Sequence, residues 1–151
     1  MSHGLKLEGV GFAYKATPVL QDINVSIPEG QFVSLLGASG SGKTTLLRLA
    51  AGLDPVDSGR LSWSGAPVVG PSLERGVVFQ DYALFPWLSV VDNVEIAIAK
   101  AKPTVRKADR QAEARRYLRD LGLEAAIGRY PGELSGGMRQ RVMIAMALAC
   151  K

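Results

Sequence analysis

The chain has 151 residues, of which 47% are hydrophobic, and its 18 basic and 14 acidic residues give a net charge of +4. This length and apolar content can bury one core, but no apolar run approaches the roughly 18 residues of a transmembrane helix. The single cysteine, Cys150, excludes an internal disulfide and is typical of a reducing compartment. A lone histidine, His3, offers no metal cluster.

The first half of the chain is predicted to be rich in strands. Apolar and polar residues alternate over residues 5–10, and compact apolar segments occur at 32–36 and 76–79. Glycines enclose a further short segment at 59–65, and the Pro-Glu-Gly sequence at 28–30 is typical of a turn. We therefore expect strands over residues 5–10, 32–36, 59–65 and 76–79.

Helices are predicted at four places. The first covers residues 45–51 and is closed by Gly52. Ser89, with an aspartate three residues later, predicts a cap for a helix that runs to about residue 101. Thr104 is expected to cap the next helix, which ends at Gly122, and Ser135 to cap a last helix that reaches the final residue.

A glycine-rich loop between the 32–36 strand and the 45–51 helix carries the strongest functional signal. It fits the pattern Gly, four residues, Gly, Lys, Ser/Thr, and it comprises Gly37, Ala38, Ser39, Gly40, Ser41, Gly42, Lys43, Thr44 and Thr45. Backbone N–H groups of such a loop and the start of its helix bind phosphate oxygens. Lys43 would reach the β- and γ-phosphates, and the Thr44 hydroxyl would bind Mg²⁺. A Gly/Ser-rich connecting loop with an incidental lysine is disfavoured by the strand and helix on either side.

A second helix start suits an anion. Ser135 is a good N-cap, and the two glycines behind it leave the start of the helix without side chains. Taken alone, this pattern is also explained by ordinary helix capping.

Together these residues make the chain resemble an ATP-binding-cassette (ABC) ATPase. The loop at 37–45 matches the family's Walker A loop, Tyr14 its adenine-stacking aromatic, and Gln80 its Q-loop glutamine. The signature sequence is matched by Leu134, Ser135, Gly136, Gly137, Met138 and Gln140. Segments 74–80, 85–87 and 92–94 resemble the taurine, nitrate and sulfonate group of bacterial importers. For Tyr14, a half-buried strand tyrosine remains an alternative, as does an edge-strand polar cap for Gln80.

The resemblance implies an α/β fold, the P-loop NTPase cassette, with an N-terminal β subdomain, a Walker A core and a helical subdomain. The catalytic core would take about residues 1–84 together with a C-terminal part that follows in the family, and the helical subdomain with the signature sequence about residues 85–151. ATP and Mg²⁺ would be the ligands, with Thr44 and Gln80 at the metal and Lys43 and Gln80 supporting hydrolysis. The signature residues would close over the ATP of a second cassette in a head-to-tail dimer.

The resemblance also implies the partners. A transmembrane permease would bind near residues 82–87, a periplasmic solute-binding protein would act indirectly, and the chain would lie at the cytoplasmic face of the membrane. The expected role is the ATP-dependent import of a small anion such as a sulfonate, taurine or nitrate. A non-catalytic nucleotide-binding remnant and a nucleic-acid-associated ATPase remain alternatives. The nucleic-acid alternative rests on residues 100–120, which carry 8 basic and 3 acidic groups. An exposed helix face also explains this basic segment, so no nucleic acid is expected as a partner.

The sequence departs from the family pattern at Lys151, where it stops inside an apolar helical run. The family continues with an apolar strand that ends in the Walker B aspartate, a general-base glutamate, a D-loop and a switch histidine, and no apolar run ending in Asp-Glu occurs in the sequence. We expect a cassette that is incomplete at its C-terminus, with very slow hydrolysis by this chain alone.

Overall fold

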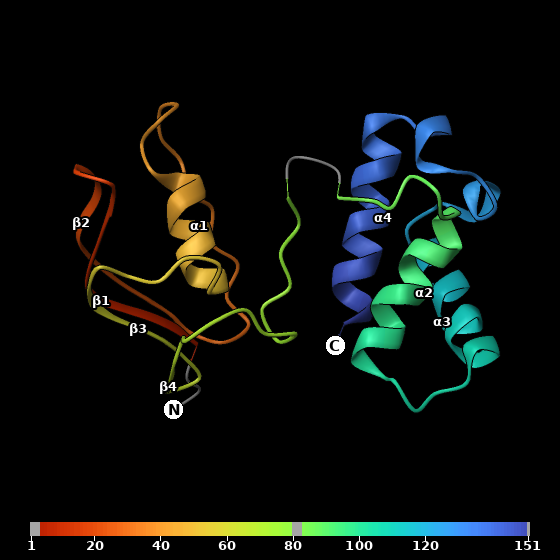
Figure 1. Cartoon of the computed structure of the whole chain (residues 1–151), viewed down its shortest axis with the longest axis horizontal. Helices are drawn as coiled ribbons and strands as arrows, with labels where there is room; N and C mark the ends of the chain where they lie inside the picture. Colours follow the sequence, from red (N-terminus) through yellow and green to blue (C-terminus); the bar gives the residue numbers. More distant parts are fainter. Residues whose placement is uncertain (1–3, 80–82, 151) are drawn as a thin grey trace. The chain divides into compact units, whose positions relative to one another are not determined.

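The computed structural model describes residues 4–79 and 83–150 of the chain. The chain forms two compact units, Met1–Ser72 and Leu73–Lys151, each with its own apolar core. Figure 1 shows strands and one helix in the first unit and a group of helices in the second.

The first unit contains an antiparallel sheet. Its strands are β1 (Leu5–Tyr14), β2 (Thr17–Ile27), β3 (Ser58–Trp63) and β4 (Ala66–Pro67), in the order β2-β1-β3-β4. All three neighbouring pairs are antiparallel. The strands predicted at 5–10 and 59–65 are therefore confirmed, and the first of them is longer than the alternation suggested.

A bulge in β1 keeps two core residues on the same face of the sheet. Leu7 and Val10 are three residues apart, so a regular strand would point them to opposite faces. The pairing with β2 shifts register between these residues, and Gly9 lies there with a φ of 60°. The bulge turns Val10 back to the side of Leu7, and both side chains are buried.

Helix α1 (Lys43–Ala51) covers one face of this sheet (Figure 1). Its Leu49 is buried with four strand residues, which are Leu7, Val10, Leu20 and Leu61. Gly52 ends the helix with a φ of 76°, and its N–H donates to the Leu49 carbonyl over 2.9 Å. The packing of α1 fixes the height of its first turn above the sheet, where the glycine-rich loop enters.

Two predicted strands are wrong. Residues 32–36 form no strand, and Phe32 and Leu36 are 90% and 92% exposed. Residues 76–79 also lack strand pairing, and Val77, Val78 and Phe79 are partly exposed. A strand requires a neighbour for its N–H and C=O groups, and no described strand pairs with either segment. The apolar composition of these two segments was therefore not sufficient to predict a strand.

The second unit is helical. It contains α2 (Val90–Ala101), α3 (Lys107–Asp120) and α4 (Gly136–Ala149), with 3₁₀ turns η1 (Glu124–Ala126) and η2 (Pro131–Glu133) before α4. The core between the helices includes Val94, Ile98, Leu118 and Val142. The three predicted helices of this region are confirmed, including the Ser89 cap and the end of α3 before Gly122.

Two helix boundaries differ from the prediction. Thr104 is not the cap of α3, because the Val105 N–H donates to the Lys102 carbonyl over 3.2 Å and closes a turn that delays the helix. The N-cap is Arg106, which makes no side-chain cap hydrogen bond. Helix α4 ends at Ala149 rather than at the final residue.

Candidate nucleotide-binding site

The glycine-rich loop depends on two left-handed glycines. Gly40 and Gly42 have φ values of 79° and 87°, which a residue with a Cβ adopts only with strain. A Cβ on Gly42 would also lie 2.9 Å from the Leu20 Cδ2, whereas one on Gly40 would meet nothing within 4 Å. Gly42 therefore sets the turn into α1 against strand β2, and Gly40 bends the open part of the loop.

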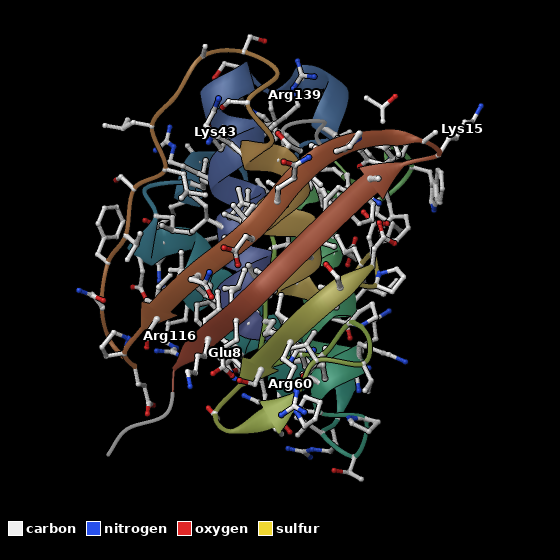
Figure 2. The ribbon with its side chains drawn as sticks, turned by 90° about the vertical axis from the view of Figure 1, so that its left-hand side faces the viewer. Glu8, Lys15, Lys43, Arg60, Arg116 and Arg139 are labelled. Carbon is white, nitrogen blue, oxygen red and sulfur yellow. The ribbon has the colours of Figure 1, made fainter. Side chains whose placement is uncertain are left out.

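The Lys43 ammonium group lies inside the loop. Its Nζ donates to the carbonyl oxygens of Gly37 and Ala38 over 2.9 and 2.6 Å, and to the Ser41 hydroxyl over 3.2 Å. These hydrogen bonds hold the loop oxygens around the ammonium group. A phosphate oxygen that entered the loop would meet this positive charge. Figure 2 labels Lys43 near the top of the view.

The start of α1 adds backbone donors to this charge. The Leu46 N–H donates to the Gly42 carbonyl over 2.8 Å, so the helix begins within the motif. The first N–H groups of a helix have no partner inside it, and they lie at the positive end of its dipole. No acidic residue occupies this first turn. Thr44 is exposed beside it, whereas Thr45 is buried beneath it. The loop and helix start together have the donors and the charge that suit an anion.

Tyr14 is the last residue of β1, and its side chain is 50% exposed. Its ring meets the Phe12 ring edge to face, with centroids 4.9 Å apart, so part of the aromatic surface remains accessible. Tyr14 thus presents an accessible ring at the end of β1.

Gln80 lies outside the described residues, as does Tyr82, so the predicted role of the Q-loop has no structural description. In the described part of the chain, His, Cys, Asp and Glu do not gather in any group of three that could hold a metal ion. Across residues 4–79 and 83–150, helices long and apolar enough to cross a membrane are also absent.

The signature-like segment forms the start of α4 in the second unit. Ser135 is the N-cap, and its Oγ accepts a hydrogen bond from the Met138 N–H over 3.3 Å. Leu134 is buried and anchors the segment, and Arg139 Nε donates to the Leu134 carbonyl over 3.2 Å. Gly137 is exposed, with nothing within 4 Å of a Cβ built on it. This helix start is open for a ligand or a partner.

Sequence reasoning missed two polar groups that hold these regions. Arg48 in the last turn of α1 binds Asp54 through two hydrogen bonds of 2.6 and 3.0 Å. Asn93, fully buried in α2, bonds the backbone of Phe85 and Leu88. A basic residue near a glycine C-cap followed by an acid was the available signal for the first pair. An amide among valines, on the buried side of a helix, was the signal for the second.

A lysine-bearing glycine loop that opens a helix over a sheet is the arrangement of P-loop nucleotide-binding proteins. The family model described as ABC transporter matches residues 20–151. The chain belongs to the ABC transporter family. The resemblance and the fold class predicted from the sequence are both confirmed.

Curated relatives of the chain are import ATP-binding proteins. The aliphatic sulfonates import ATP-binding protein of Bacillus licheniformis is 43% identical over 132 residues, which are 87% of this chain and 50% of that protein. The nitrate import ATP-binding protein of Synechocystis is 51% identical and covers 87% of this chain and 48% of its own length. The taurine import ATP-binding protein of Escherichia coli O157:H7 is 47% identical, and the match covers 90% of this chain and 52% of that protein. The chain therefore spans about half the length of these relatives.

A solved structure shares the fold. A dimeric ATP-binding cassette in a post-hydrolysis state, bound to ADP and Pi, is 34% identical, with a TM-score of 0.87. The match covers 97% of this chain and 69% of that one. A second dimeric structure, of a bacterial ABC transporter cassette, has a TM-score of 0.86.

Proposed function

We propose that the chain is the nucleotide-binding part of an ABC importer subunit, which couples ATP binding and hydrolysis to the uptake of a small anionic solute. The observation that carries this proposal is the Lys43 ammonium group inside the loop, bonded to the Gly37 and Ala38 carbonyls. A cation whose hydrogen bonds go to neutral oxygens, beside the unpaired N–H groups of a helix start, is suited to a polyphosphate. The names of the curated relatives support ATP as the nucleotide and import as the process.

Each part of the nucleotide would have its own contacts. The backbone N–H groups of residues 37–45 would surround the β-phosphate, and Lys43 would neutralise charge on the β- and γ-phosphates. The exposed Thr44 hydroxyl would hold Mg²⁺, which supplies charge neutralisation when bound. The accessible face of Tyr14 would stack on the adenine ring.

Hydrolysis would proceed by attack of a water on the γ-phosphorus, with cleavage of the bond to the β–γ bridging oxygen and release of ADP and phosphate. Lys43 and the loop N–H groups would stabilise charge on the leaving ADP oxygen. Gln80 would orient the water, as its match to the Q-loop implies. Positioning accounts for most of the rate in this chemistry, so turnover is more sensitive than binding to a missing group.

The exposed helix start at Ser135 would act on a second cassette. Gly137 has no side chain, and the Ser135 oxygen accepts a hydrogen bond from the Met138 N–H. This end of α4 could therefore approach a γ-phosphate held by a partner copy. The two solved cassettes that resemble this chain are described as dimeric, which supports a head-to-tail pair. ATP would then lie between the Walker A loop of one copy and the α4 start of the other.

The remaining partners follow from the importer assignment. A transmembrane permease would bind the aromatic segment that includes Phe85 and Trp87, whose rings lie 5.6 Å apart. Trp87 is 71% exposed, and exposed aromatic residues are favoured at protein interfaces. A periplasmic solute-binding protein would select the solute, and the subunit would lie on the cytoplasmic side of the membrane.

Calorimetric titration with Mg-ATP tests the proposal. We expect saturable binding to the wild-type chain and a loss of about tenfold or more in Lys43→Met, since a charge-assisted contact contributes about 1.5–3 kcal/mol. Lys107→Met, at an exposed lysine of α3, is the matched control and should bind ATP as the wild type does. Equal affinities in all three proteins would overturn the proposal. Binding without phosphate release would instead identify a non-catalytic nucleotide-binding chain.

A further inference from the structure

Asp57 joins the end of β1 to the connection between α1 and β3. The Ala13 N–H donates to Asp57 Oδ2 over 2.7 Å, and the Asp57 N–H donates to the Gly11 carbonyl over 3.0 Å. The bond from Ala13 is charge-assisted, because its acceptor is a carboxylate. Asp57 therefore holds the backbone on both sides of Phe12, directly before Tyr14.

The Asp57 side chain continues the pairing of β1 beyond the point where β3 begins. The last pair of β1 with β3 is Gly11 opposite Ser58. The two chains lie close together there, since a Cβ on Gly11 would be 2.5 Å from the Ser58 Oγ. Ala13 lies past this pair, and the carboxylate accepts its N–H in place of a strand carbonyl. One side chain thus extends the hydrogen bonding of the sheet toward Tyr14.

The end of β1 is also connected to the phosphate loop through β2. Leu20 of β2 lies opposite Phe12 of β1. Leu20 also borders the turn into α1, because a Cβ on Gly42 would lie 2.9 Å from the Leu20 Cδ2. Phe12 in turn meets the Tyr14 ring edge to face, with centroids 4.9 Å apart. A displacement of this strand end would therefore move the Tyr14 ring relative to the phosphate loop.

We propose that Asp57 is a positioning residue, which fixes the end of β1 so that the accessible Tyr14 ring lies at a defined place for the base of ATP. This inference rests on the function proposed above. Asp57 belongs to the short connection between the end of α1 at Ala51 and the start of β3 at Ser58. The helix that begins at the phosphate-binding lysine therefore leads directly to the residue that fixes the base-stacking strand end.

A fixed strand end matters because Tyr14 is the last residue of β1 and is 50% exposed. A segment with few backbone hydrogen bonds opens locally, and ordering it on binding reduces the affinity for the ligand. The two bonds of Asp57 impose this order before the nucleotide arrives. The phosphates would contact the glycine-rich loop and the start of α1 instead. Loss of the Asp57 carboxylate should therefore affect the binding of the base and spare that of the phosphates.

The test compares two ligands, ATP and inorganic tripolyphosphate, each with Mg²⁺, by calorimetric titration of the full chain. Asp57→Ala should weaken ATP binding by about three- to tenfold, which is part of the stacking contribution of an aromatic residue, and leave tripolyphosphate binding unchanged. Asp57→Asn retains an acceptor oxygen for the Ala13 N–H and should bind ATP within about twofold of the wild type.

A double-mutant cycle tests whether Asp57 acts through Tyr14. Tyr14→Ala removes the ring and should weaken ATP binding by about tenfold or more. In this background, Asp57→Ala should cause no further loss, because the ring that it positions is absent. Full multiplication of the two single effects would overturn the inference.

Controls separate positioning from stability. Glu8→Ala removes another exposed acid that contacts β1, where Glu8 pairs with Lys6 over 2.7 Å, and should change the affinity for neither ligand. If Asp57→Ala folds poorly, Asp57→Glu, which keeps the charge but displaces the carboxylate, should show the same selective loss of ATP affinity. An equal loss for both ligands, or a loss in Asp57→Asn as large as in Asp57→Ala, would overturn the inference.

The outcome is distinguishable from failure of the proposed function. If Lys43→Met leaves the binding of both ATP and tripolyphosphate intact, the phosphate site itself is wrong. If Lys43→Met weakens the binding of both ligands and Asp57→Ala weakens neither, the phosphate site stands and the role of Asp57 is rejected.

Discussion

Asn93 and Phe85 are joined by a pair of hydrogen bonds in opposite directions. The Phe85 N–H donates to the Asn93 Oδ1 over 2.8 Å, and the Asn93 Nδ2 donates to the Phe85 carbonyl over 3.1 Å. The same Nδ2 lies 3.1 and 3.0 Å from the carbonyl oxygens of Leu88 and Ser89. One buried amide therefore organises the backbone that presents Trp87.

Replacing Asn93 should destabilise the second unit. Asn93→Ala removes the acceptor of the Phe85 N–H and the donor to three carbonyl groups, although the Phe85 carbonyl keeps the Leu88 N–H over 3.1 Å. We expect a loss of about 2–3 kcal/mol in the free energy of unfolding. Urea unfolding followed by circular dichroism measures this loss. Gln111→Ala, which removes only a weak 3.4 Å contact with Asp92, should cost less than about 0.5 kcal/mol. Equal stability of the two variants would contradict the role given to Asn93.

The two left-handed glycines of the phosphate loop should differ in their response to alanine. Gly40→Ala meets open space and should cost about 1 kcal/mol from the positive φ alone. Gly42→Ala adds a contact of 2.9 Å with Leu20 and should cost about 1–2 kcal/mol more. Thermal unfolding of both variants checks the order, and a larger loss at Gly40 would show that the loop packs differently against β2.

Ser135 and Thr104, both predicted from the sequence to be helix caps, should differ in their effect on stability. Ser135 accepts a hydrogen bond from the Met138 N–H, so Ser135→Ala should cost about 0.5–2 kcal/mol. Thr104 precedes a helix that begins at Lys107, so Thr104→Ala should change stability by less than about 0.5 kcal/mol. Chemical unfolding of the two proteins measures the difference. A larger loss of stability in Thr104→Ala than in Ser135→Ala would show that Thr104 is the cap of its helix.

Stability should depend on pH through Asp54. The hydrogen bonds from Arg48 hold the pKa of Asp54 below its usual value, so the pair stabilises the folded chain above the pKa of about 3.9 in the unfolded state. As the pH falls through the lower folded pKa, Asp54 is protonated and this stabilisation disappears. Arg48 is 40% exposed, so solvent screens the pair and its contribution to stability is small. The stability difference between wild type and Asp54→Asn should be constant above pH 5 and shrink below pH 4; a difference that grows in acid would contradict this sign.

The sequence predicted the local backbone features of the candidate site more fully than it predicted the sheet. The loop from Gly37 to Thr45 and the cap at Ser135 were found because glycine and serine at those positions act through local backbone geometry. The strand at 32–36 was predicted from apolar residues, but a strand forms only with a partner for its backbone groups. Pairings such as Arg48–Asp54 and Asn93–Phe85 depend on how the chain turns back on itself, which periodicity does not reveal.

Hydrogen–deuterium exchange with and without Mg-ATP tests the central claim most directly, because that claim concerns the backbone N–H groups around Lys43 and the start of α1. Our account predicts that ATP slows exchange most strongly in the peptide that contains residues 37–46. Lys43→Met should abolish this protection, and Lys107→Met should retain it. Unchanged exchange across 37–46 while ATP is bound, with protection only elsewhere in the chain, would contradict the account.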